Sequence, residues 1–326
     1  MIRENKINGF YRLFTVLLVI VMNGLSQGDD TDYTDNAGTI IRHEANQNTR
    51  YTWFSYVPIN LEMDEPAYIL IGNLQYPGVC DANVRASYVR SEVQEEIPWS
   101  EKYRFVLLHP AIPYNCNIKW DPWVRHFPKY VFTNSPNSKF YRPDLRVNAM
   151  IDALNYQLSS AGYNIQPKIF LIGFSVGGHF SNRYALIQPA RVKAFTAGGL
   201  SGKLTLPENK HEGIPMKWDM GISNYKSLVG KPFRRDLFKQ IPMFIFTGEK
   251  DFDNYWLWSG CYNGWAPDHC HWLEVWGKDI PTALRNQSNF LNDLGYKITF
   301  KIYPDVGHVY NDQMRTDEFE FLHQYR

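Results

Sequence analysis

The segment 173–177 (Gly-Phe-Ser-Val-Gly) places Ser175 between two glycines in a G-x-S-x-G pattern. It directly follows the apolar run 168–172 (KIFLI) and directly precedes a segment that can form a helix. At a strand-to-helix turn of this kind the serine adopts a strained backbone conformation, and the glycines avoid the crowding that a Cβ would cause. The pattern in this context predicts a nucleophilic serine.

Two later segments supply the groups that a serine nucleophile requires. A serine hydroxyl is a poor nucleophile at neutral pH, so it needs a histidine that takes its proton and a carboxylate that orients the histidine. Asp251 and Asp253 come after the apolar run 242–248, and His308 comes after the run 297–303. Serine, acid and histidine follow in this chain order in the fold that places the nucleophile on a strand-to-helix turn. We predict Asp251 as the acid and His308 as the general base, with Asp253 on the same loop as the alternative acid.

The tetrahedral intermediate of this chemistry needs two backbone N–H groups, which form an oxyanion hole. One comes from the residue after the nucleophile, here Val176, and the other from a loop after an earlier strand. The loop after the run 103–109 contains Ala111 and Ile112 between two prolines, which have no N–H to give. We expect Val176 and Ala111 to be the donors, with Ile112 as the alternative to Ala111.

Short apolar runs alternate with longer amphipathic segments along the chain. Several runs are apolar without interruption, which is typical of strands buried on both faces of a parallel sheet. The expected strands are 51–58, 67–72, 103–109, 168–173, 192–197, 242–248 and 297–303, and the expected helices are 143–161, 177–186, 280–294 and 312–323. The alternation predicts an α/β fold with a mostly parallel, doubly wound sheet and helices on both faces. We expect the first two runs to form an antiparallel hairpin at the N-terminal edge.

Two stretches, 204–233 and 252–277, lack this periodicity; the second carries five tryptophans. We expect both to leave the sheet and to wall a cleft. The second stretch lies between the predicted acid and base, so we expect it to favour an apolar, aromatic or sugar-linked acyl group. Trp256, Trp258 and Trp265 are the side chains expected to set this selectivity.

The N-terminus has the pattern of a secretory signal peptide. Basic residues precede the apolar run 13–22, which is too short to cross a bilayer as a helix, and small residues follow it. We expect a signal peptide at 1–26, a polar spacer at 27–49 and a single catalytic domain at 50–326; an uncleaved membrane anchor is the alternative. The protein is then secreted, periplasmic or held at the cell surface, with no stable membrane span after cleavage.

Four cysteines form an even set in a chain that we expect to reach an oxidising compartment, which predicts disulfides. Of the three possible pairings we favour Cys261 with Cys270, which closes a short loop, and Cys80 with Cys116. The stretch 268–271 (Asp-His-Cys-His) contains residue types that bind zinc. It lacks the paired spacing of known zinc sites, so we expect no metal.

The composition excludes several classes of protein. The 326 residues carry 34 Lys and Arg against 33 Asp and Glu, which gives a formal net charge of +1. Without a long basic run the chain lacks the electrostatic footprint of a nucleic-acid-binding protein, so we expect no nucleic-acid partner. A content of 44% hydrophobic and 16% aromatic residues excludes a disordered chain.

Four segments resemble the α/β-hydrolase superfamily, and look most like bacterial-type esterases around the polyhydroxyalkanoate depolymerase and feruloyl esterase group. They are FYRPDLRVNAMIDAL (140–154), KIFLIGFSVGGHFSNRYALIQPARVKAFTAGG (168–199), FIFTGEKD (244–251) and YPDVGHVY (303–310). The resemblance implies the α/β-hydrolase fold, with Ser175 as nucleophile, Asp251 as acid and His308 as base. Where many relatives carry His-Gly in the oxyanion loop, this chain has His109-Pro110.

The residues and the resemblance predict a secreted serine hydrolase that cleaves carboxylic esters through an acyl-enzyme and uses no cofactor. Its substrate would be a small or polymer-linked ester. A polyester depolymerase or a peptidase on the same scaffold is the first alternative. The second is a binding module that kept the fold and lost its chemistry; such modules commonly lack a triad member, whereas all three are present in this chain.

Overall fold

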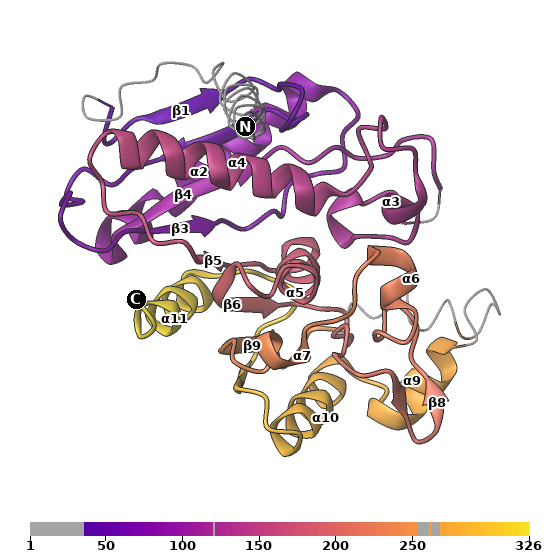
Figure 1. Ribbon diagram of the computed structural model, residues 1–326. Helices are drawn as coiled ribbons and strands as arrows, with labels where there is room; N and C mark the ends of the chain where they lie inside the picture. Colours follow the sequence, from indigo (N-terminus) through magenta and orange to yellow (C-terminus); the bar gives the residue numbers. More distant parts are fainter. Residues whose placement is uncertain (1–35, 120, 253–260, 262–267) are drawn as a thin grey trace, which may run out of the picture.

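The computed structural model describes residues 36–119, 121–252, 261 and 268–326. Within this part of the chain, eight strands form one sheet in the order β1-β2-β4-β3-β5-β6-β9-β10 (Figure 1). Their bounds are β1 (Ile40–His43), β2 (Trp53–Tyr56), β3 (Tyr68–Ile71), β4 (Phe105–Pro110), β5 (Ile169–Leu171), β6 (Val192–Gly198), β9 (Met243–Gly248) and β10 (Ile298–Tyr303). Strands β2, β3, β4, β5 and β9 are buried at every residue, because helices cover both faces of the sheet.

The sheet is antiparallel at its N-terminal edge and parallel from β4 to the β10 edge. β2 pairs antiparallel with both β1 and β4, whereas β3 pairs parallel with both β4 and β5. The hairpin at the edge therefore consists of β1 and β2, and the hairpin expected between 51–58 and 67–72 is wrong. The expected spacer at 27–49 contains β1, whose four residues include Arg and His and give too short an apolar signal to be predicted.

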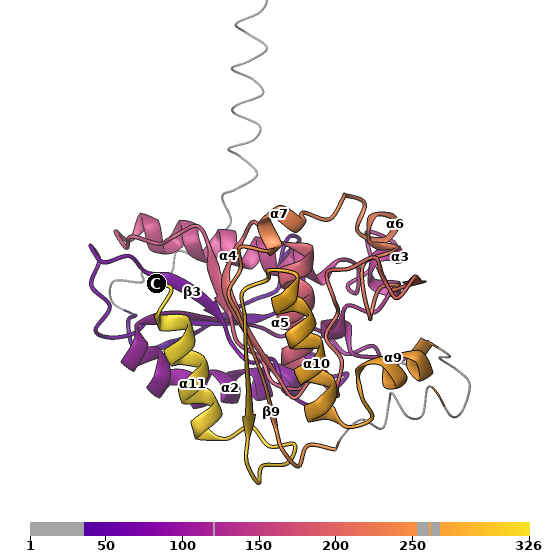
Figure 2. The same cartoon turned by 90° about the horizontal axis from the view of Figure 1, so that it is seen from below.

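Two layers of helices enclose the sheet. α2 (Ala82–Tyr103) and α11 (Asp312–His323) pack against each other on one face (Figure 2). The other face is covered by α4 (Pro143–Ser160), α5 (Val176–Ile187) and α10 (Ile280–Asp293). The helices α4, α5, α10 and α11 begin and end within one residue of the positions expected from the sequence.

α2, the longest helix of the described residues, is not predicted from the sequence because polar residues interrupt its apolar pattern. Its buried face carries Val89 and Val93, but Glu96 and Ser100 stand where the next apolar side chains would be. Pro98 also lies inside the helix, where proline is normally unfavourable. Packing against the sheet and α11 therefore outweighs the weak helical pattern of this segment.

The two stretches expected to be irregular contain short elements. Stretch 204–233 contains β7 (Lys210–His211), β8 (Ile214–Pro215) and α6 (Tyr225–Val229), and the described part of 252–277 contains α9 (Asp268–Trp276). The other short helices are η1 (Val124–His126), α3 (Tyr130–Thr133) and α7 (Arg235–Phe238). Trp256, Trp258 and Trp265 lie outside the described residues.

The predicted signal peptide at 1–26 and residues 27–35 of the predicted spacer also lie outside the described residues. In the part of the chain that the structure does describe, none of the helices combines the length and the apolar character that a bilayer span requires.

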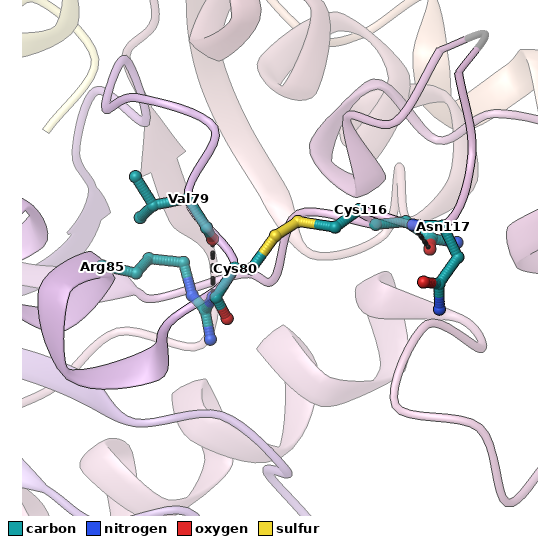
Figure 3. The surroundings of a disulfide bond; sticks show 6 residues. Val79, Cys80, Arg85, Cys116 and Asn117 are labelled. Atoms are coloured by element: carbon teal, nitrogen blue, oxygen red, sulfur yellow. Dashed lines mark hydrogen bonds between the residues drawn. A yellow bond between two sulfur atoms is a disulfide. The ribbon is translucent and has the colours of Figure 1, made fainter.

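The structure pairs Cys80 with Cys116 and Cys261 with Cys270, with Cα atoms 6.1 and 4.7 Å apart, as the sequence analysis favours. Cys80 lies between β3 and α2, and Cys116 lies in the segment after β4. Figure 3 shows Arg85 of α2 beside this disulfide, where its guanidinium donates to the carbonyl oxygen of Cys80 at 3.4 Å. The segment after β3 is thus tied both to α2 and to the segment after β4.

Candidate active site

Ser175 lies at the turn between β5 and α5. Its φ of 55° and ψ of −119° fall outside the regions that residues with a side chain normally adopt. Its N–H donates to the carbonyl of Gly198 at the end of β6 at 2.8 Å, and its carbonyl accepts from the N–H of His179 at 3.1 Å. These bonds hold the turn between the sheet and α5, and Ser175 itself stays partly exposed.

The glycines around Ser175 are required by close backbone contacts. A Cβ on Gly173 would lie 2.2 Å from the carbonyl oxygen of Gly177, and a Cβ on Gly178 would lie 2.6 Å from the carbonyl oxygen of Gly198. Neither distance leaves room for a carbon atom. The glycine pattern seen in the sequence is therefore a packing requirement of the turn that presents Ser175.

Three side chains from three separate loops meet in one line of hydrogen bonds. His308 Nε2 lies 3.1 Å from Ser175 Oγ, and His308 Nδ1 lies 3.0 Å from Asp251 Oδ2. Asp251 is fully buried and also accepts from Thr247 Oγ1 at 3.3 Å. A carboxylate on Nδ1 favours the tautomer whose Nε2 accepts a proton. The structure thus brings together Ser175, His308 and Asp251, while Asp253 lies outside the described residues.

Backbone contacts join the loops that carry Asp251 and His308. The N–H of Lys250, directly before Asp251, donates to the carbonyl of Val306 at 2.8 Å. A Cβ on Gly248, the last residue of β9, would lie 2.2 Å from that same carbonyl oxygen. The loop after β10 therefore folds directly over the end of β9, which carries His308 to Asp251.

A buried carboxyl group lies on the far side of the imidazole. The ring of Phe174 packs between His308 and Tyr310, with ring centroids 4.9 and 5.3 Å away. The hydroxyls of Tyr310 and Thr196 both donate to the carboxyl of Glu318, which is fully buried on α11. Burial raises the pKa of the Glu318 carboxyl to about 8. At neutral pH this group is mostly protonated, so it adds little negative charge beneath the triad.

The structure does not support Ala111 as an oxyanion donor. Its N–H donates to the carbonyl of Thr52 at 2.9 Å, and the N–H of the alternative, Ile112, donates to the carbonyl of Pro110 at 2.9 Å. The cause is the strand order, because β3 lies between β4 and β5 in the sheet. The prediction of Ala111 requires the segment after β4 to face Ser175, whereas the segment after β3 is the neighbour.

Leu74, in that segment after β3, is a further candidate donor and is not among the residues predicted from the sequence. A Cβ on Gly177 would lie 2.9 Å from the backbone nitrogen of Leu74, so this nitrogen lies close against the first turn of α5. Neither the Leu74 N–H nor the Val176 N–H donates to any residue that the structure describes. Gly177, in the glycine pattern around Ser175, is the sequence signal of this close backbone approach.

The zinc-binding residue types at 268–271 lie on α9, where Cys270 is bonded to Cys261. Among the residues that the structure describes, no cluster of three or more His, Cys, Asp or Glu side chains has an arrangement that could hold a metal ion.

Comparison with known proteins identifies the fold of this chain. No family model and no curated protein sequence matches the chain. Poly(aspartic acid) hydrolase-1 from Sphingomonas sp. KT-1 is similar in structure, with a TM-score of 0.57 and 14% identity over 87% of this chain and 96% of that one. A poly(3-hydroxybutyrate) depolymerase from Bordetella parapertussis has a TM-score of 0.53 and 17% identity over 87% of this chain and 90% of that one. This chain has the α/β-hydrolase fold.

The α/β-hydrolase fold explains why chain order and spatial order agree at the site. Ser175, Asp251 and His308 follow β5, β9 and β10, and parallel strands end at one edge of the sheet. The predicted fold, a mostly parallel sheet with an antiparallel N-terminal edge, is confirmed. Because this fold carries many chemistries, the function must be argued from the side chains of the site.

Proposed function

We propose that the chain is a serine hydrolase that cleaves carboxylic esters through an acyl-enzyme. The observation that carries this proposal is the line of hydrogen bonds from Asp251 through His308 to Ser175. The three side chains come from separate loops, and one of them lies on a strained turn in front of a helix. Such an arrangement is costly to maintain and matches the geometry of an activated serine.

The proposed reaction has two stages. Ser175 Oγ attacks the ester carbonyl carbon while His308 Nε2 takes the hydroxyl proton, and the tetrahedral intermediate then expels the alcohol, which receives that proton. Water attacks the acyl-enzyme in the same way and releases the acid. Asp251 holds the imidazole in the required tautomer and stabilises the imidazolium in both stages.

The oxyanion is stabilised by the N–H groups of Val176 and Leu74 in this proposal. Val176 is the first residue of α5, so its N–H points out of the start of the helix, where the helix dipole also favours negative charge. The Leu74 N–H lies against the same helical turn. A pair of donors on opposite sides of a carbonyl oxygen provides the stabilisation that this chemistry requires.

An apolar acyl group suits the surroundings of the triad. Phe252 follows Asp251 directly and is 67% exposed, and Val309 follows His308 directly and is 57% exposed. Two exposed apolar side chains beside the acid and the base favour an apolar ester over a small polar one. A polymer-linked ester is the second candidate. The exposed side chains of Phe252 and Val309 can contact a polymer surface, and the two structurally similar enzymes are named for polymers.

Export from the cytoplasm is part of the proposal. All four cysteines are paired in disulfides. Disulfides persist in oxidising compartments and are rare in the cytosol. Together with the signal-peptide pattern of residues 1–26, they support a secreted, periplasmic or cell-surface enzyme.

Hydrolysis of p-nitrophenyl esters from acetate to octanoate tests the proposal. We expect the mature protein to turn these substrates over and Ser175→Ala to abolish turnover. Ser181→Ala, which alters a buried hydroxyl on the same helix, should leave turnover unchanged. A serine-directed phosphonate followed by mass spectrometry should label Ser175. A folded sample with neither turnover nor labelling would instead favour the binding module.

A further inference from the structure

A buried polar network joins the segment after β3 to α2, to β4 and to the Ser175 turn. Glu96 Oε1 accepts from the backbone N–H of Asn73 at 2.8 Å, and Glu96 Oε2 lies 3.0 Å from His109 Nε2. The side-chain oxygen of Asn73 accepts from the N–H of Phe174 at 2.9 Å. Glu96, Asn73 and His109 are each at most 2% exposed. The residue directly before Leu74 is therefore fixed through both its backbone and its side chain.

Two glycines make room for this network. A Cβ on Gly72 would lie 1.9 Å from His109 Nε2 and 2.3 Å from Glu96 Oε2, and a Cβ on Gly177 would lie 2.3 Å from Asn73 Oδ1. A buried carboxylate is unfavourable unless it is paired and hydrogen-bonded, and the buried face of a helix normally carries apolar residues. Glycines in the segment after β3 and at the start of α5 thus leave space for the polar side chains of Glu96, His109 and Asn73, which a purely apolar core would not require.

We propose that Asn73 and Glu96 are positioning residues that hold the Leu74 N–H at the oxyanion. This inference rests on the proposed function and adds the residues that place its second donor. Without Glu96 the Asn73 N–H would be buried without an acceptor, so the segment would rotate to find one. Without the Asn73 amide oxygen the segment would lose its bond to the Ser175 turn. Either change moves the Leu74 N–H away from its working position.

The kinetic signature of such a displacement follows from what the donor binds. An oxyanion hole stabilises the negative charge of the transition state more than the neutral ester carbonyl. Its loss therefore lowers kcat and changes KM little. A purely structural role would lower the melting temperature and leave kcat per folded molecule unchanged.

Asn73→Ala and Asn182→Ala form a matched pair for the first test. The Asn182 side chain is also buried and also accepts a backbone N–H at 2.9 Å, but its hydrogen bonds go to Thr205 and not to the segment after β3. We expect Asn73→Ala to lower kcat about a hundredfold with KM within about threefold, as for removal of one oxyanion donor. Asn182→Ala should lower Tm by a similar amount and keep kcat within about twofold.

Glu96→Leu and Glu96→Gln form the second test. Gln still accepts the Asn73 N–H through its carbonyl oxygen, so it should keep most of the activity. Leu removes the acceptor, and we expect a loss of kcat similar to that of Asn73→Ala. A crystal structure of Glu96→Leu should show residues 72–75 displaced from the first turn of α5. This structural readout does not depend on any substrate.

The outcomes separate this inference from the proposed function. Wild-type turnover with kcat unchanged in Asn73→Ala and Glu96→Leu would overturn the positioning role alone. An undisplaced segment 72–75 in Glu96→Leu would do the same. A folded wild-type protein with no turnover and no phosphonate labelling would overturn the proposed function, and the positioning role with it. A loss of kcat that Glu96→Gln rescues, with Asn182→Ala active, supports the inference.

Discussion

Ser175 is held in its conformation by its neighbours and not by its own preferences. A φ of 55° is unfavourable for a residue with a Cβ, and the bonds to Gly198 and His179 hold Ser175 in this conformation. The strain places the hydroxyl at His308 Nε2 before any substrate binds. At this scale the proposed site consists of one serine hydroxyl whose position is fixed by backbone contacts and one imidazole that is hydrogen-bonded to Asp251.

Asp251→Asn tests the role of the buried carboxylate. An amide at this position cannot hold the imidazole in the tautomer that accepts the Ser175 proton, so we expect kcat to fall about 10³- to 10⁴-fold with little change in KM. The measurement is steady-state hydrolysis of p-nitrophenyl butyrate. Asp305→Asn is the control, because that carboxylate lies near the same loop but its side chain is 83% exposed. Comparable activity in Asp251→Asn and the control would contradict the triad.

Phe252 and Val309 test the apolar substrate. We expect the double variant Phe252→Ala/Val309→Ala to lower kcat/KM for the octanoate ester about tenfold, since each truncation removes apolar contact with a long chain. The kcat/KM for the acetate ester should change less than about twofold, because its methyl group is too short to reach Phe252 and Val309. The measurement is the ratio of the two kcat/KM values. Equal losses on both esters would show that the two side chains act on the triad and not on the acyl chain.

At the scale of elements, α11 contributes a titratable group to the floor of the site. Glu318 accepts hydrogen bonds from Thr196 of β6 and from Tyr310, which stacks on Phe174 beneath His308. Burial raises the pKa of Glu318 to about 8, far above its ordinary value of 4.5. The folded protein therefore binds this proton more tightly than the unfolded chain does. Between these two pH values the free energy of unfolding falls as pH rises.

Glu318→Gln should remove that dependence. The amide resembles the protonated carboxyl, so we expect the fall in Tm of the wild type between pH 6.5 and 8 to shrink by about 4 °C in the variant. Glu92, whose pKa burial also raises to about 8, contributes equally to both proteins and cancels in the comparison. Buried histidines such as His43, with a pKa lowered by burial to about 4, act below this window. Parallel Tm curves of the two proteins would contradict the prediction.

The elements that the sequence predicts are those with a simple apolar pattern. α4 is read correctly because its apolar residues recur without interruption, whereas α2 is missed because Glu96 and Ser100 occupy its buried face. The polar residues that hide α2 from a pattern search include the one that we assign to positioning the oxyanion donor. Sequence patterns do not reveal this helix because buried polar side chains interrupt its apolar pattern.

The triad and the oxyanion hole differ in predictability for a geometric reason. Ser175, Asp251 and His308 each follow their own strand, so chain order alone is enough to choose them. The second oxyanion donor depends on which strand lies beside β5 in the sheet. The sheet places β3 there, although β4 is closer along the chain. The N–H of Ala111 is bonded to the carbonyl of Thr52, and spatial strand order is information that chain order alone does not contain.

At the scale of the whole molecule, the two disulfides close very different lengths of chain. Cys80–Cys116 closes a loop with a sequence separation of 36 that contains all of α2 and β4. Cys261–Cys270 closes a loop with a sequence separation of 9, at the start of α9. Because a disulfide restricts the unfolded chain more when its loop is longer, the first should stabilise the fold more than the second. The loop-entropy relation gives about 4 kcal/mol for the first and about 2.5 kcal/mol for the second.

Paired serine substitutions measure this difference directly. We expect Cys80→Ser/Cys116→Ser to lower Tm by about 5–10 °C and Cys261→Ser/Cys270→Ser to lower it by a few degrees less. Cys80→Ser/Cys116→Ser should also lower kcat for p-nitrophenyl esters, because the Cys80–Cys116 disulfide anchors the segment after β3 that carries Leu74. Cys261–Cys270 lies elsewhere and cannot replace this anchor. Scanning calorimetry and steady-state kinetics on the same samples separate the two effects. The prediction is contradicted if removal of Cys261–Cys270 lowers Tm more than removal of Cys80–Cys116. The contribution of each disulfide would then depend on strain in the folded protein and not on the freedom of the unfolded chain.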